Sequence, residues 1–134
     1  MWRIRKRWIS GAVVRGDGRG RQLGFPTANL VLDKPSKKPR EGIWACWVRV
    51  KGEKHMYQGV MHVGPRPTIP GALESIEIHI IGETTLDLYG KKLLFSPVKH
   101  LREVQKFNSL EELTLAVQQD IHDAAAFLQE RSSF

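Results

Sequence analysis

The residues best suited to chemistry begin with a glycine-rich segment near the N-terminus. It contains Gly16, Gly18, Arg19, Gly20, Arg21 and Gly24, followed by Pro26. Glycines let a backbone turn tightly and approach a ligand closely, so successive amide groups can form a nest for phosphate. The segment lacks the Lys and Ser/Thr that end a Walker A loop, and it lacks the strand-loop-helix setting of a Rossmann fingerprint. Taken as glycines alone, the segment fits an irregular hairpin loop better than a phosphate site.

Two neutral oxygen ligands follow this segment. Thr27 and Asn29 are two residues apart, so their side chains lie on the same face of an extended strand. A hydroxyl and an amide carbonyl beside a phosphate nest suit Mg²⁺, which keeps several waters and shares its remaining sites with substrate phosphates. The alternative, in which both residues make turn hydrogen bonds, stays open on these residues alone.

A third set of polar side chains lies in the run from 75 to 80. Alternation places Ser75, Glu77 and His79 on one face and three isoleucines on the other. That strand therefore has a polar face available for chemistry, although a solvated surface face has the same pattern. Nucleophilic catalysis has no support, because Cys46 lies in an apolar run without a cationic neighbour. The five histidines show no metal-ligand spacing.

Several short β-rich runs must position these side chains. They cover residues 9–14, 27–32, 43–50, 56–63, 75–81 and 92–95, with Gly, Pro, Asp and Ser between them. Six short strands at this spacing predict an all-β fold, either a closed barrel or a sandwich. We find no internal repeat or linker, so residues 1–134 are expected to form a single domain with its core at about 9–130.

The last quarter of the chain changes period. Its apolar residues follow the three-and-four spacing of an amphipathic helix: Leu110, Leu113, Ala116, Val117, Ile121, Ala124 and Leu128. Ser109, with Glu112 three residues on, has the spacing of a capping box that would start this helix. We expect the helix to pack on the barrel and close one end.

Composition limits the function classes. The apolar content of 41% and charged content of 26% are ordinary for a globular domain and exclude disorder. A lone cysteine, no signal-peptide apolar region and no run of about 20 apolar residues predict a cytoplasmic protein outside the membrane. The net charge of +7 favours a polyanionic partner. Nucleotide phosphate ranks ahead of nucleic acid, because no aromatic platform or recognition helix accompanies the basic residues.

Taken together, the motifs resemble those of a known family. Residues 16–30 closely resemble the signature of the bacterial and eukaryotic riboflavin kinases, including its Pro-Thr-Ala-Asn core. Further motifs follow in the family's order: Gly-Ile-Trp-Ala at 42–45, Gly-Pro-Arg-Pro-Thr at 64–68, Glu-Ile-His-Ile at 77–80, Asp-Leu-Tyr-Gly at 87–90, Leu-Arg at 101–102, Lys-Phe at 106–107 and Ser-Leu-Glu-Glu-Leu at 109–113. Together they cover the chain from residue 9 to about 125.

The resemblance implies an all-β fold, a six-stranded closed barrel with a Greek-key-like order and a C-terminal helix packed on it. It also implies an ATP-dependent enzyme that phosphorylates the 5′-hydroxyl of riboflavin to give FMN. It implies ATP phosphates at Gly16, Gly18, Arg19, Gly20, Arg21, Gly24, Pro26 and Thr27, Mg²⁺ at Thr27 and Asn29, Glu77 as catalytic base, and flavin at Arg102, Val104 and Phe107. The expected partners are ATP and riboflavin, with no nucleic acid and no membrane. We expect a monomer, working beside a separate FAD synthetase.

Two positions depart from the family's pattern. His62 stands where many members have Asn, and Val104 stands where many have Glu. Many bacterial members also carry an adenylyltransferase domain, for which 134 residues leave no room, so the chain is expected to be monofunctional or a fragment. The rival hypotheses are a non-catalytic flavin- or nucleotide-binding module of the same fold and a basic nucleic-acid-binding barrel, which only the charge supports.

Overall fold

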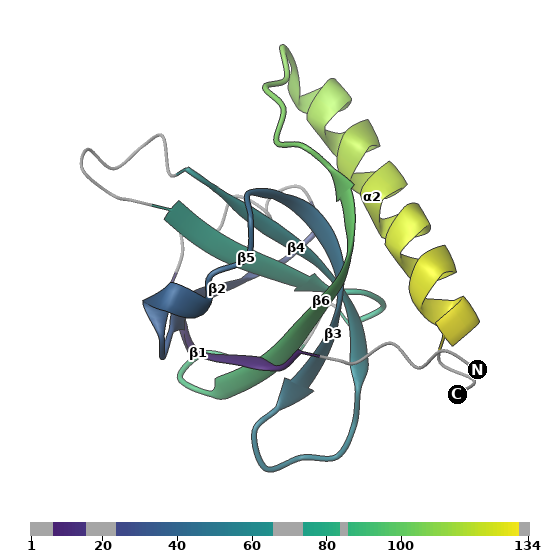
Figure 1. The fold of residues 1–134 in the computed structure, drawn as a ribbon. Coiled ribbons are helices and arrows are strands. Elements are labelled where there is room, and N and C mark those ends of the chain that lie inside the picture. The colour runs from purple at the N-terminus through teal and green to yellow at the C-terminus, as the bar shows by residue number, and fades with distance from the viewer. Residues whose placement is uncertain (1–6, 16–23, 66–73, 84–85, 132–134) are drawn as a thin grey trace.

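The fold rests on six antiparallel strands that close into a barrel. The computed structural model describes residues 7–15, 24–65, 74–83 and 86–131. The strands are β1 (Ile9–Val14), β2 (Ala28–Leu32), β3 (Gly42–Val50), β4 (Tyr57–Pro65), β5 (Glu74–Ile80) and β6 (Lys92–Arg102). They pair in the closed order β1-β2-β5-β4-β3-β6 (Figure 1). The predicted barrel is confirmed.

Alternation along the strands fills the barrel interior. The interior cluster takes every second residue of β5, namely Ile76, Ile78 and Ile80, together with Met61 and Val63 of β4. Leu88, from the connection between β5 and β6, joins the same cluster. Residues between these inward positions must point to the outer surface. The polar face of β5 therefore faces outward.

The strand β6 is longer than predicted. The run of apolar residues ends at Phe95, but β6 continues through Pro97 to Arg102. Pro97 cannot donate to a ladder and normally marks a strand end or a bulge. Here it lies opposite Cys46, next to a register shift between Ala45 and Cys46 of β3. A bulge thus lets the strand pass its proline and carry Arg102 beyond the barrel core.

The helix α2 (Leu110–Arg131) follows β6 and begins at the predicted cap. The hydroxyl of Ser109 accepts a hydrogen bond from the backbone N–H of Glu112 at 3.1 Å. The Glu112 carboxylate accepts one from the N–H of Asn108 at 3.1 Å, one residue before the donor of an ideal capping box. Among the described residues, no helix combines the length and apolar character that crossing a membrane requires.

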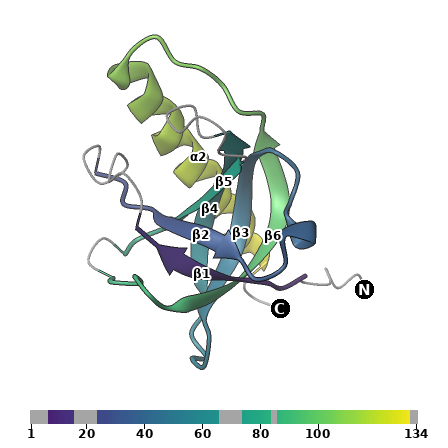
Figure 2. The ribbon, with the colours of Figure 1, turned by 90° about the vertical axis from the view of Figure 1, so that its left-hand side faces the viewer.

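The helix packs on the barrel, as predicted, but it lies along the outer wall rather than over an end. Figures 1 and 2 show it against β3, β4 and β6, which are its main contacts. Its buried residues Ala124 and Leu128 meet outward-facing residues of the wall, Ile43, Ala45, Trp47 and Val60. Strand β3 is apolar on both faces, so its outer face needs a cover. Leu110, expected in the apolar stripe, is instead 67% exposed, because it precedes the part of the helix that meets the wall.

Candidate active site

The outward face of β5 carries Glu77 between two neighbouring strands. In the sheet, Glu77 lies directly opposite Asn29 of β2 and directly opposite His62 of β4. The residues flanking each of the three point into the core, so all three side chains leave the outer surface at the same level. Side chains in such opposed positions have Cβ atoms about 4.5 to 5.5 Å apart. An amide, a carboxylate and an imidazole are therefore adjacent on one face.

His62 lies partly buried at the edge of this row. Burial lowers the pKa of its imidazole from the usual value, while the nearby Glu77 carboxylate acts in the opposite direction. An added Cβ on Gly64 would lie 2.8 Å from His62 Cε1 and 3.3 Å from Val104 Cγ2. His62 and Val104, the two positions that depart from the family's pattern, are thus neighbours, and Gly64 lies between them.

His79, the other polar residue on this face of β5, has a structural partner. Its Nδ1 lies 2.8 Å from the carbonyl oxygen of Pro26. A carbonyl only accepts hydrogen bonds, so Nδ1 is the donor in this contact. The ring also meets Phe25 edge to face, with 6.0 Å between centroids. His79 thus ties the segment before β2, which includes Thr27, to β5.

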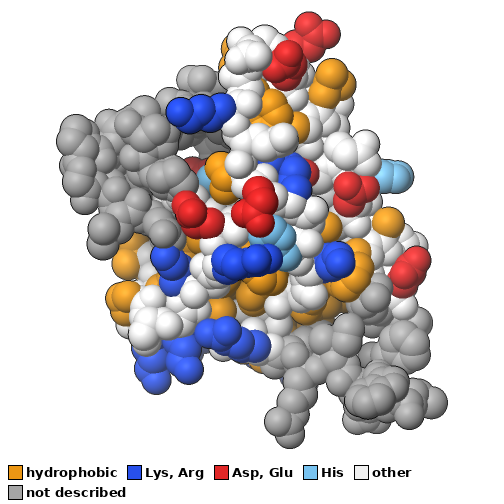
Figure 3. All heavy atoms as spheres, turned by 45° about the horizontal axis from the view of Figure 1, so that its top comes forward, with side chains coloured by type: hydrophobic (Ala, Val, Ile, Leu, Met, Phe, Trp, Pro, Cys, Tyr) orange, Lys and Arg blue, Asp and Glu red, His pale blue; other side chains and the backbone are white. Residues whose placement is uncertain are grey.

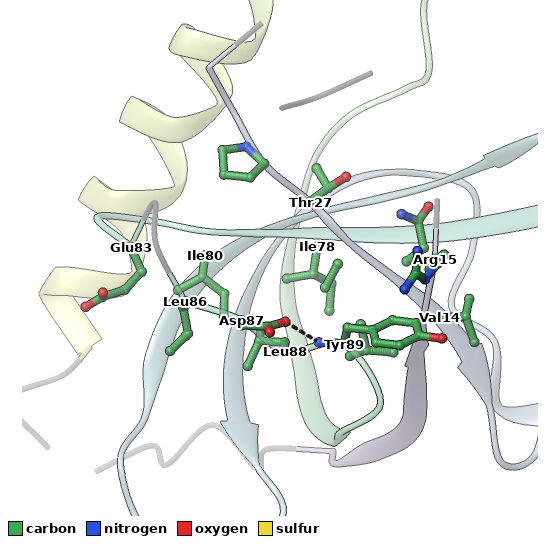
Figure 4. A pocket seen from close by; sticks show the side chains of 14 residues that line it. Val14, Arg15, Thr27, Ile78, Ile80, Glu83, Leu86, Asp87, Leu88 and Tyr89 are labelled. Atoms are coloured by element: carbon green, nitrogen blue, oxygen red, sulfur yellow. Dashed lines mark hydrogen bonds between the residues drawn. The ribbon is translucent and has the colours of Figure 1, made fainter. Parts of the chain in front are cut away.

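An open pocket of about 630 Å³ lies where β1 ends and β2 begins (Figure 4). Three of the predicted site residues line it: Pro26, Thr27 and Asn29. Gly24 is exposed nearby in the chain, whereas Gly16, Gly18, Arg19, Gly20 and Arg21 lie outside the described residues. Glu77 does not line the pocket, but its neighbour Ile78 does, and Asn29 belongs to both the pocket and the outer row.

The rim of the pocket includes residues to which the sequence had assigned no role. Arg15 lies over the ring of Tyr89, 4.8 Å from its centroid. The backbone N–H of Tyr89 donates to Asp87 Oδ1 at 3.1 Å, which shapes the turn after β5 (Figure 4). The motif at 87–90 was a signal for this part of the site, but local spacing could not join it to Arg15, more than 70 residues away.

The predicted flavin residues share one segment, which runs from the end of β6 toward α2. Arg102 donates from Nε to Asp120 Oδ1 at 2.8 Å and from Nη2 to Asp120 Oδ2 at 2.7 Å. Its Nη1 donates to the carbonyl oxygen of Glu103 at 3.0 Å, and its guanidinium lies 5.7 Å from the ring centroid of Phe107. Much of the hydrogen-bonding capacity of Arg102 is therefore used inside the protein. Val104, between these residues, packs toward Gly64.

A metal site built only from protein ligands has no support in the described part of the chain. There, no three His, Cys, Asp or Glu side chains gather as ligands. Thr27 and Asn29 both line the pocket, and together they offer a hydroxyl and an amide oxygen. This small neutral donor set fits Mg²⁺, which takes few protein ligands when substrate phosphates supply the others.

The family model and the curated relative both point to one family. The family model described as Flavokinase, riboflavin kinase, matches residues 4–128. The bifunctional riboflavin kinase/FMN adenylyltransferase of Escherichia coli strain K12 is 40% identical over 119 residues, which make up 89% of this chain and 37% of that protein. The chain thus spans little more than a third of the length of this curated relative.

Two solved structures have a similar fold. The crystal structure of riboflavin kinase from Trypanosoma brucei matches with a TM-score of 0.62 and 26% identity, covering 91% of this chain and 79% of that one. A crystal structure described as a macrolide-efflux protein from Streptococcus pneumoniae matches with a TM-score of 0.76 and 30% identity, covering 86% and 37%.

Proposed function

Because this chain belongs to the riboflavin kinase family, we propose that it transfers the γ-phosphoryl group of ATP to the 5′-hydroxyl of riboflavin, giving FMN and ADP. The observation that carries the proposal is the pairing of Asn29 with Glu77 across β2 and β5. It joins the strand that leaves the glycine-rich segment to the carboxylate on the outer face. A phosphate donor and an acceptor hydroxyl would meet at this junction.

In the proposed reaction, Glu77 orients the riboflavin hydroxyl and accepts its proton. The hydroxyl oxygen forms a bond to the γ-phosphorus, the bond from that phosphorus to the oxygen bridging to the β-phosphate breaks, and ADP leaves. Phosphoryl transfer depends mainly on positioning and charge neutralisation, so a carboxylate need not be a strong base. Glu77 suits this role because it is partly buried and lies between β2 and β4.

The pocket beside β2 is the proposed nucleotide site. Its lining combines Thr27 and Asn29 with the Arg15 and Tyr89 pair. The first two residues could contact the phosphate chain, and the second two could contact the aromatic ring of the nucleotide. We expect the glycine-rich segment at 16–24 to contribute backbone N–H groups to the phosphates. Thr27 and Asn29 would hold Mg²⁺, which supplies charge neutralisation at the phosphates when it is bound.

Riboflavin is proposed to lie on the outer face between Glu77 and the segment at 102–107. Val104 and Phe107 offer apolar contacts, and Arg102 holds the segment against α2 through Asp120. Figure 3 shows acidic and basic side chains interspersed on the face it presents. That mixture favours small-molecule substrates over a nucleic acid, which would select a continuous basic surface. We place the reaction in the cytoplasm, on the sequence argument alone.

The test is direct. Purified protein is incubated with ATP, Mg²⁺ and riboflavin, and the products are separated by chromatography. We expect FMN to form only when all three are present, with Glu77→Gln as a matched control that keeps the shape of the side chain. Riboflavin binding without FMN formation would favour the non-catalytic module instead.

A further inference from the structure

His62 is placed to act on Glu77 from the neighbouring strand. The two residues are direct partners in the β4 and β5 register, and their flanking residues Met61, Val63, Ile76 and Ile78 all belong to the interior cluster. Both side chains therefore leave the same outer face, and their Cβ atoms lie at the short separation of opposed pairs. Asn29 occupies the equivalent place on the other side of Glu77.

The imidazole has unused hydrogen-bonding capacity. Among the described residues, His62 Nδ1 is a buried atom without a hydrogen-bond partner. A buried polar nitrogen left unpaired is unfavourable, so such atoms usually have a partner in the working state of a protein. The ring is confined by Gly64 and Val104 on one side. The nearest acceptor that its register provides is the Glu77 carboxylate.

From this geometry we propose that His62 is a positioning residue for Glu77: in the substrate complex its imidazole hydrogen-bonds the Glu77 carboxylate and orients it toward the reacting hydroxyl. The inference rests on the proposed function, because it needs Glu77 to act on a hydroxyl. It assigns a role to a residue that the motifs left without one. It also predicts that turnover depends on the protonation state of His62.

The groups around the His62 ring determine how its protonation, and with it turnover, depends on pH. Burial and Arg102 of β6 disfavour the protonated imidazole, whereas Glu77 of β5, the backbone of His62 itself and Asp120 of α2 favour it. The partner of His62 on β3 is the apolar Ile43, and the segment after β6 contributes the apolar Val104. Burial is the largest of these effects, so the imidazole is neutral at neutral pH. On protonation it would bind the carboxylate as an ion pair and weaken it as a proton acceptor.

The first experiment measures turnover in a double-mutant cycle. We expect His62→Leu to lower kcat by about 10-fold with KM for both substrates within about twofold, because a misplaced base costs turnover rather than binding. In the Glu77→Gln background, His62→Leu should lower kcat by less than about twofold, because no base is left to orient. A full 10-fold loss in both backgrounds would mean that His62 acts independently of Glu77, and would overturn the proposal.

Conservative replacement separates positioning from packing. His62→Asn keeps a donor group but cannot be protonated, so it should restore most of the turnover at neutral pH and move the acidic limb of the pH profile to lower pH. An acidic limb identical to that of the wild type would contradict the proposal. His122→Asn is the matched control, because His122 is exposed on α2 and lies outside the proposed site.

The second experiment needs no activity. The titration of His62, followed by NMR of its imidazole protons, should shift to lower pH in Glu77→Gln, because the carboxylate that favours the charged ring is gone. The control substitution His122→Asn should leave the His62 titration unchanged. An unchanged His62 titration would exclude the contact. If the wild type formed no FMN, the proposed function would fail, while this titration would still decide whether the two side chains are coupled.

Discussion

The carboxylate of Asp120 accepts two hydrogen bonds from the guanidinium of Arg102, at 2.8 and 2.7 Å, and so joins the middle of α2 to the end of β6. Asp120 is 5% exposed, and the Arg102 side chain is 24% exposed. Two parallel N–H to oxygen contacts of this kind combine strength with a fixed orientation. The pair therefore fixes where the segment at 103–107 starts.

Loss of Arg102 should cost stability. Arg102→Ala leaves a buried carboxylate without its cation, and we expect the free energy of unfolding to fall by about 3 kcal/mol. Asp120→Asn should cost less, because it strands no buried charge and Arg102 is partly exposed to water. Urea unfolding followed by circular dichroism would measure both. Equal stability of Arg102→Ala and the wild type would show that the pair contributes nothing.

The same two variants test how Arg102 serves riboflavin. We expect Arg102→Ala to weaken riboflavin binding, measured by quenching of flavin fluorescence. If Arg102 acts by holding the segment at 103–107, Asp120→Asn should weaken binding as well, although Asp120 itself need not touch the ligand. Normal binding in Arg102→Ala would remove the segment from the proposed flavin site.

Sequence patterns predicted which face of a strand a side chain occupies, but not the contact between Arg102 and Asp120. Alternation in β5 correctly put Glu77 and His79 on one outward face, because a strand's side-chain period is local. The link between Arg102 and Asp120 depends on where α2 docks, so no local pattern contains it. Its one signal was a carboxylate within the apolar stripe of the helix, between Val117 and Ala124.

Strand order is the second feature that local patterns do not determine. The row of Asn29, Glu77 and His62 exists because β5 lies between β2 and β4. Sequential pairing would instead have put β3 beside β2. The length of β6 was missed for a related reason: Pro97 reads as a strand end, and only the register shift against β3 accommodates it.

The metal and phosphate site gives a further prediction. Removing the hydroxyl in Thr27→Ala should weaken binding of Mg·ATP by roughly 10- to 100-fold, the usual effect of losing one contact to a charged group. Riboflavin binding should change little, and Thr27→Ser should keep most of the affinity. Calorimetry on each folded variant would measure both ligands. Unchanged nucleotide affinity in Thr27→Ala would exclude the hydroxyl from the site.

Asn29→Ala should differ from Thr27→Ala in one respect. Asn29 is buried and makes an interaction within the protein, so its removal should also lower the free energy of unfolding. We expect weaker binding of Mg·ATP together with a lower midpoint of urea unfolding. Asn29→Asp, which keeps the oxygen ligand and adds a charge, should retain metal binding. Loss of stability with normal nucleotide affinity would make Asn29 a structural residue only.

The pH dependence of stability gives a further prediction. The folded-state pKa of His62 is lowered by burial from the usual 6.5, so the folded protein binds fewer protons than the unfolded chain. The resulting contribution of His62 to the free energy of unfolding is fully present above about pH 6.5 and is lost as the pH falls through the folded-state pKa. His62→Asn should therefore lose less stability than the wild type between pH 7.5 and pH 5.5, in urea unfolding at each pH. His122→Asn should follow the wild type, and equal slopes in all three proteins would contradict the assignment.

The last prediction separates Glu77 from His79, which lie on the same face of β5. His79 is 8% exposed, and its Nδ1 donates to the carbonyl oxygen of Pro26, so only its Nε2 could accept a proton. Glu77 has its carboxylate on the outer face beside Asn29 and His62. Glu77→Gln should therefore lower turnover by roughly 10²- to 10⁴-fold, with binding of both substrates largely intact. His79→Asn should cost much less turnover and act mainly on stability and on KM for ATP, because it loosens the segment that carries Thr27. Steady-state rates, with circular dichroism to confirm folding, decide the matter: near-wild-type turnover in Glu77→Gln, or a collapse only in His79→Asn, would rule out Glu77 as the base.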